Sequence, residues 1–145
     1  MNKIELMNKY VANLAVLNVK LHNLHWNVVG IRFMSVHQFT ESLYDDFFAK
    51  FDDVAEQIKI LGQTPVSTLK GYLAIADVEE IEEKDFATTE VLKIVKADLE
   101  LMNKTAKEIR AVADEEGDFN TVAMFEEHSA GYEKNLWFLS AMLKK

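Results

Sequence analysis

Apolar residues recur every three or four positions in four long segments of this 145-residue chain, and no other feature constrains the fold as strongly. The first two stripes are Met7, Tyr10, Leu14, Leu17, Leu21, Leu24 and Val28, then Val36, Phe39, Leu43, Phe47, Phe51, Val54, Ile58 and Leu61. The other two are Val91, Val95, Leu99, Met102, Ala106, Ile109 and Ala113, then Val122, Phe125, Ser129, Tyr132, Leu136, Leu139 and Leu143. Each stripe marks one face of a helix, and four such faces can bury one another. The sequence therefore predicts an all-α four-helix bundle.

Residues typical of helix ends fall between the stripes. They are Gly30 after the first stripe, Gly62 and Pro65 after the second, Thr88 or Thr89 as the N-cap of the third, and Gly117 followed by Asp118 between the third and the fourth. Glycine commonly ends a helix, proline cannot continue one, and threonine or aspartate caps the first turn. These residues support the boundaries that the apolar period indicates.

The links between the helices predict the topology. The first and second stripes, and the third and fourth, are joined by short links, so each pair should form an antiparallel hairpin. The stretch from 62 to 87 is long enough to run the length of the bundle, with a short helix near residues 69–74. A bundle with one long crossover between its second and third helices has the ferritin-like connection. We expect a single domain over residues 1–145.

Composition excludes several classes of function. The chain has no cysteine, which removes thiolate catalysis and iron–sulfur or cysteine-based zinc sites. Its net charge of -8 argues against a sequence-independent grip on nucleic acid, which needs clustered cations. The first residues lack the apolar stretch of a signal peptide, and no segment approaches the roughly 18 apolar residues of a membrane span. We therefore expect a cytoplasmic protein with no membrane partner.

A polar stripe runs beside the apolar face of the second helix. It contains His37, Glu41, Asp45, Asp52 and Glu56, which fall within about 100° of one another on a helical wheel. Imidazole and carboxylate groups are the ligands expected for iron or zinc. A run of acids alone is more often a solvated face. The histidine at the start of the stripe and Phe48 in its middle favour a metal-binding contact surface instead.

Spacing shows that one chain cannot complete this site. His37 and Asp52 are fifteen residues apart, about 22 Å along a helix. If two copies of the helix pack antiparallel about a two-fold axis near residues 44–48, His37 of one copy lies beside Asp52 and Glu56 of the other. Such an isologous dimer forms two identical sites.

The first helix offers a further ligand. His25 lies at the edge of the apolar stripe and near the helix end, and the short link brings that end close to His37. A lone histidine in such a place is usually a hydrogen-bonded boundary residue. The joint pattern of His25, His37, Asp52 and Glu56 favours ligation.

These residues resemble the Dps family of mini-ferritins over essentially the whole chain. The matching segments are 20–30 (KLHNLHWNVVG), Val36-His37, 51–56 (FDDVAE), 61–65 (LGQTP) and 67–70 (STLK). The most specific element is the spacing itself, with twelve residues from His25 to His37, fifteen to Asp52 and four to Glu56.

The resemblance implies a hollow homododecamer with ferroxidase sites at its two-fold interfaces. His25 and His37 match ligands from one subunit, and Asp52 and Glu56 match ligands from its partner. Trp26 matches an aromatic residue thought to take part in electron transfer. The family oxidises Fe(II), preferably with hydrogen peroxide, and stores ferric mineral inside the shell, which suppresses hydroxyl-radical production.

The resemblance also implies iron-entry pores at three-fold axes. Asp118 and Glu127 match pore acids near the start of the last helix, whereas Ala123 stands where another acid is expected. Asp118 is equally well placed to cap that helix. The lysine-rich tail of the DNA-binding members is absent, so DNA binding is not expected.

Other functions remain as alternatives. Glu41 and Asp45 are candidates for a weaker second metal position or for hydrogen bonds to the ligands, and zinc is a candidate competitor for iron. A di-iron centre inside the bundle needs Glu-x-x-His pairs, and no histidine here has a glutamate three residues before it. A DNA-compacting assembly protein without oxidase activity is opposed by the acidic charge. A haem bundle or helical metal regulator would need histidine or methionine pairs facing the core.

Overall fold

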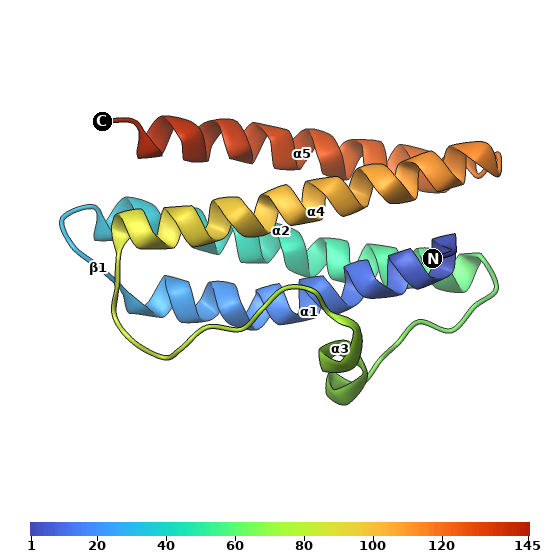
Figure 1. Cartoon of the computed structure of the whole chain (residues 1–145), viewed down its shortest axis with the longest axis horizontal. Helices are drawn as coiled ribbons and strands as arrows, with labels where there is room; N and C mark the ends of the chain where they lie inside the picture. The colour runs from blue at the N-terminus through green and yellow to red at the C-terminus, as the bar shows by residue number, and fades with distance from the viewer.

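The computed structural model describes residues 1–145 as an almost entirely helical protein (Figure 1). The helices are α1 (Lys3–Asn27), α2 (Phe33–Ile60), α3 (Leu69–Ile75), α4 (Thr88–Glu115) and α5 (Phe119–Leu143), and the strands are β1 (Val28–Val29) and β2 (Phe86–Ala87). The four long helices lie side by side as two hairpins, α1 with α2 and α4 with α5 (Figure 1). The prediction of an all-α bundle with a long crossover that carries a short helix is confirmed.

The apolar stripes form the core between the helices. One residue from each long helix illustrates this: Tyr10, Phe47, Met102 and Phe125 are each at most 1% exposed. The stripe of α4 is buried along its whole length. Removing these faces from water is the main term that stabilises the bundle.

The crossover from α2 to α4 passes along α1 and is held there by side chains of that helix (Figure 1). The side-chain oxygen of the buried Asn13 accepts hydrogen bonds from the backbone N–H groups of Asp77 and Val78, at 2.7 and 3.1 Å. Further along, β1 and β2 pair in parallel, Val28 with Phe86. The sequence did not indicate this sheet, because two residues are too few to show the alternation of a strand.

One predicted helix end is wrong and another is confirmed. The N-cap of α4 is Ala87, and neither Thr88 nor Thr89 caps the helix. Their hydroxyl groups instead accept hydrogen bonds from the guanidinium of Arg32, at 3.3 and 3.1 Å. Asp118 does cap α5, and it follows Gly117, whose φ of 71° lies in the left-handed region that glycine adopts freely.

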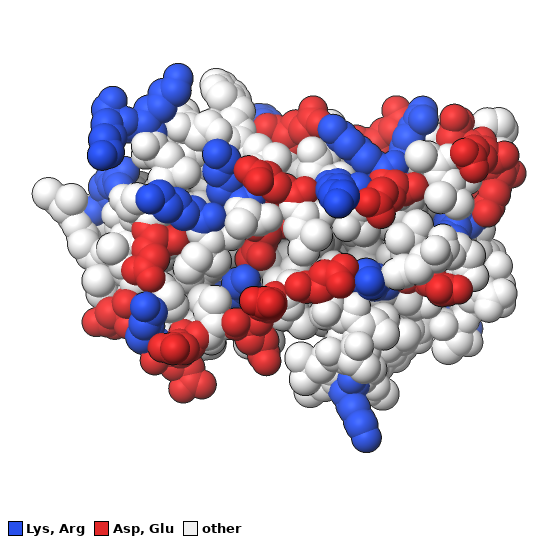
Figure 2. All heavy atoms as spheres, viewed as in Figure 1, with Lys and Arg blue, Asp and Glu red and all other residues white.

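The face of the molecule in Figure 2 carries intermingled acidic and basic side chains. Basic side chains gather at the upper-left end of that face, and acidic side chains are spread over the rest of it, in keeping with the net charge of -8. None of the helices combines the length and the apolar character that crossing a bilayer requires.

Candidate metal centre

The structure brings His25 and His37 together at the joint between α1 and α2. Their imidazole rings stack with centroids 3.6 Å apart and planes 12° from parallel. His25 is 5% exposed, while His37 is partly exposed. The short link after α1 makes this contact, as the sequence predicted.

Reciprocal hydrogen bonds fix the two rings. His25 Nδ1 lies 2.7 Å from the backbone oxygen of His37, and His37 Nδ1 lies 2.8 Å from the backbone oxygen of His25. A carbonyl oxygen only accepts, so each Nδ1 carries a proton and donates. Each Nε2 is then left with a free lone pair, which is the form in which histidine binds a metal.

Surrounding groups favour the neutral form of His25. Burial is the largest effect on its pKa and lowers it, and the neighbouring His37 lowers it further, against the hydrogen bond to the His37 carbonyl. The hydroxyl of Thr40 lies 3.1 Å from His25 Nδ1 and donates to the backbone oxygen of Val36. A neutral His25 ring held in one orientation can bind a metal through Nε2 without first losing a proton.

Acidic and aromatic side chains flank the histidine pair. A carboxylate oxygen of Glu41 lies 3.8 Å from His25 Nε2, so Glu41 reaches the side of the ring that carries the free lone pair. Asp45 lies one turn further along α2 and is exposed. Trp26 is 69% exposed, and its ring lies 5.4 Å from that of His22.

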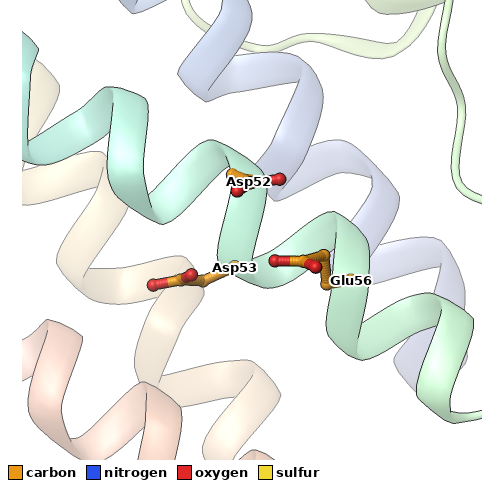
Figure 3. Close-up of side chains that lie close together, drawn as sticks. All are labelled: Asp52, Asp53 and Glu56. Atoms are coloured by element: carbon orange, nitrogen blue, oxygen red, sulfur yellow. The ribbon is translucent and has the colours of Figure 1, made fainter.

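The acids at the other end of the polar stripe form a second group. Ligand atoms of Asp52, Asp53 and Glu56 lie within 4.8 Å of one another, and all three side chains are exposed (Figure 3). The sequence indicated Asp52 and Glu56 through their four-residue spacing. It missed Asp53, which points away from the stripe on an ideal helix. Its position directly after Asp52 was the only available signal.

One chain does not bring the histidine pair and the acidic group together. His37 and the acidic group lie on the same helix, α2, where His37 is fifteen residues from Asp52, about 22 Å along the axis. Between them stands Phe48, which is 62% exposed. It borders an almost wholly apolar hollow over α1 and α3 that is also lined by Val19, Leu69 and Tyr72. An exposed apolar patch of this kind is typical of a contact surface.

The predicted pore residues have different surroundings. Asp118 accepts a hydrogen bond from the backbone N–H of Thr121 and pairs with Lys3 at 2.9 Å. Burial would raise the pKa of the Asp118 carboxyl, but the bonds from Lys3 and Thr121 outweigh it and lower that pKa. Glu127 and Ala123 are exposed on α5. Asp118 thus has a structural role in the single chain.

Comparison with known proteins finds relatives that match this chain over nearly its whole length. A family model described as a ferritin-like domain matches residues 4–145. A DNA protection during starvation protein of Helicobacter pylori is 36% identical over 143 residues, covering 99% of both chains. A protein of the same description from Brevibacillus brevis is 38% identical, over 96% of this chain and 93% of its own.

Solved structures agree with the sequence relatives. The structure of Dps from Listeria innocua superposes with a TM-score of 0.95 at 34% identity, and the match covers 99% of this chain and 95% of that one. The chains therefore share their fold from end to end, including the crossover and its short helix.

Proposed function

This chain belongs to the ferritin-like family and, within it, to the Dps proteins, and on that premise we propose that it oxidises Fe(II) and stores the ferric product in a hollow homododecamer. Iron is the substrate and the stored material. Hydrogen peroxide is the preferred oxidant, and the oxidation sites lie between subunits.

The observation that carries this proposal is the geometry of the two histidines. Both rings are locked by Nδ1–H bonds to backbone oxygens, and both Nε2 atoms are free. A core histidine with a purely structural role needs no second imidazole stacked on it. Glu41, 3.8 Å from His25 Nε2, supplies a carboxylate at the same place for a second ion or for orienting a ligand.

The remaining ligands come from the second copy in this proposal. Two α2 helices packed antiparallel about an axis near Tyr44–Phe48 put His25 and His37 beside Asp52 of the partner subunit and Glu56 of the partner subunit. The exposed Phe48 and the apolar hollow around it are then covered by the partner. Such a dimer is isologous and carries two equivalent sites.

The ligand set suits the oxidation of iron. Two imidazoles and two carboxylates bind Fe(II), and the carboxylates stabilise the harder Fe(III) that forms. Two Fe(II) ions supply the two electrons that reduce one hydrogen peroxide molecule to water, with two protons taken up. Four protein ligands leave coordination positions open for peroxide. Trp26, which follows His25 in the chain, is an aromatic group that can pass electrons. Zinc, which favours the same ligands, competes for the site.

Protection of DNA follows indirectly in this proposal. Removing Fe(II) and peroxide together limits the hydroxyl radical, whatever the protein binds. The net charge of -8 and the acidic side chains spread over most of the face in Figure 2 disfavour direct binding to DNA phosphates. A gel shift at low salt tests this point, and strong binding of DNA would contradict it.

The function is tested by following Fe(II) oxidation with peroxide and with oxygen, and then sizing the iron-loaded particle. The double variant His25→Gly with His37→Gly should lose most peroxide-dependent oxidation while its particle size is unchanged. His22→Gln is the matched control, since His22 lies on the same helix as His25, its hydrogen bond goes to the backbone oxygen of Asn18, and its ring stacks on Tyr44. Wild-type rates in the double variant would refute the site, and a stable monomer or dimer would refute the shell.

A further inference from the structure

A polar cluster that takes no part in the proposed metal site is buried in the middle of the bundle. It consists of Tyr10 from α1 and of His128 and Tyr132 from α5, which are 0%, 6% and 1% exposed. The phenol oxygen of Tyr10 lies 2.9 Å from His128 Nδ1 and is hydrogen-bonded to the phenol of Tyr132. Burying polar groups costs free energy that phenylalanine would avoid, so packing alone does not account for this cluster.

The direction of the hydrogen bonds follows from which arrangement satisfies both phenols. If Tyr132 donates to Tyr10 and Tyr10 donates to His128 Nδ1, each phenol proton has an acceptor. The reverse order would leave the Tyr132 proton without one in a fully buried place, which is costly. The chain therefore runs from Tyr132 to Tyr10 to His128, and His128 carries its own proton on Nε2.

The environment keeps all three groups neutral at rest. Burial lowers the pKa of His128 to about 3, with a smaller contribution from Lys50, and burial raises the pKa of Tyr10 well above its usual value. Lys50 lies 5.6 Å from the centre of the Tyr132 ring and is itself paired with Asp46. A protonated phenol thus donates to an unprotonated imidazole.

His128 also connects the cluster to solvent. It lines an open groove between α2 and α5 whose other polar residues include Asp46, Lys50, Asp53 and Lys134. Tyr10 and Tyr132 do not line this groove. A proton can therefore pass between the cluster and solvent through the imidazole of His128, while the phenols of Tyr10 and Tyr132 have no contact with solvent.

The cluster lies behind the acidic half of the metal site. The reciprocal bonds between residues 25 and 37 set the register of the antiparallel α1 and α2, in which facing residues have numbers that sum to 62. Tyr10 is thus level with Asp52. Tyr10 is buried in the core while Asp52 is exposed, and Asp53 of the acidic group lines the same groove as His128.

We propose that Tyr10, supported by Tyr132 and His128, is a buried redox site that takes up single oxidising equivalents formed during iron oxidation. This inference rests on the proposed function. Its oxidant is the hydroxyl radical that forms beside the two-electron reaction when a single Fe(II) gives one electron to peroxide, which also yields hydroxide and Fe(III). A hydrogen-bonded phenol beside a base loses an electron and a proton together, which a phenylalanine in the same place cannot do.

The step balances in electrons and protons. Tyr10 gives one electron to the hydroxyl radical, which becomes hydroxide, and its O–H proton moves to His128 Nδ1. The phenol oxygen is then a neutral radical that accepts hydrogen bonds from Tyr132 and from the new Nδ1–H. An electron from a further Fe(II), which becomes Fe(III), and the return of the proton from His128 restore the phenol.

The test measures the tyrosyl radical by electron paramagnetic resonance in the assembled protein, in two arms. In one arm Fe(II) and peroxide are mixed and frozen, and in the other a photochemical one-electron oxidant acts without iron. We expect a long-lived tyrosyl signal in both arms, with most of it lost in Tyr10→Phe. Tyr72→Phe, which removes a phenol outside the cluster, should keep the signal.

Further variants separate a redox role from a structural one. His128→Gln should lower the radical yield and shift the g-value that reports hydrogen bonding to the phenol oxygen, with particle size and helicity unchanged. A radical unaffected by Tyr10→Phe, or no tyrosyl radical in the photochemical arm, would overturn the proposal. Absence of iron oxidation with the photochemical signal intact would refute the proposed function and leave the buried redox site standing.

Discussion

Mixing two inactive variants tests whether each metal site is shared between subunits. One variant carries His25→Gly and His37→Gly, and the other carries Asp52→Asn and Glu56→Gln. His37 and Asp52 of one chain lie about 22 Å apart along α2, so the two halves of a site come from different chains and neither variant alone can form a complete one. Each alone should oxidise Fe(II) with peroxide at a small fraction of the wild-type rate.

A mixed dimer of the two variants is predicted to regain one site. In one of its two sites both halves are damaged, while the other combines intact histidines from one chain with intact acids from its partner. Random pairing of equal amounts makes half of the dimers mixed, and half of their sites are complete, so about a quarter of wild-type activity should return.

The assay uses the two variants co-expressed at equal levels and compares the initial rate of peroxide-dependent Fe(II) oxidation with that of each parent. Mixing particles that are already assembled is the control, because subunits that do not exchange should restore nothing. A co-expressed mixture no faster than the average of its parents would refute the shared site.

Three further predictions concern assembly and stability. Phe48→Asp places a charge on the exposed apolar patch, so light scattering should show a smaller particle with slow iron oxidation although all four ligands remain; a full-sized, active particle would contradict the interface. Lys20→Met removes the ammonium group that lies 2.8 Å from the partly buried carboxylate of Asp98, and should cost about 3 kcal/mol in denaturant unfolding. Adding Asp98→Leu should recover most of that loss, and no recovery would show that the charge was not its cause. Because the pKa of His128 is lowered from 6.5 to about 3, the unfolded chain binds a proton that the folded chain does not. The free energy of unfolding should fall as pH drops through that window, by up to about 1.4 kcal/mol per pH unit, and His128→Gln should flatten the slope.

Periodicity predicted the long helices well because it reports a local property. A helix such as α4 buries one face along its whole length, so the positions of Val91, Leu99 and Ile109 are dictated by the helical repeat alone. The helix ends were predicted less accurately. Gly117 and Asp118 behaved as their types predict, whereas Thr88 and Thr89 bind Arg32, the residue just before α2, in place of capping α4. A contact between elements overrode a local preference there.

In the candidate site too, some features were predicted from the sequence and others were found only in the structure. The spacing of His37, Asp52 and Glu56 was enough to predict that one chain cannot close the site, since the rise of a helix is fixed. The proximity of His25 to His37 followed from the short link. The sequence contained nothing to predict the stacked rings or the reciprocal Nδ1 bonds, which depend on how closely α1 and α2 approach.

The amino-acid sequence by itself determined the helices, their order and the ligand types along α2, because each depends on the residue period and side-chain chemistry of one segment. Only the tertiary structure decided the protonation pattern of the histidine pair, the grouping of Asp53 with Asp52 and Glu56, and the burial of Tyr10, His128 and Tyr132 as one hydrogen-bonded chain. Tyr10 and Tyr132 appear in the sequence as two ordinary members of apolar stripes. Their phenols meet only because side chains of α1 and α5, two helices at opposite ends of the sequence, reach each other across the core of the bundle. A hydrogen bond between residues 122 positions apart depends on that packing.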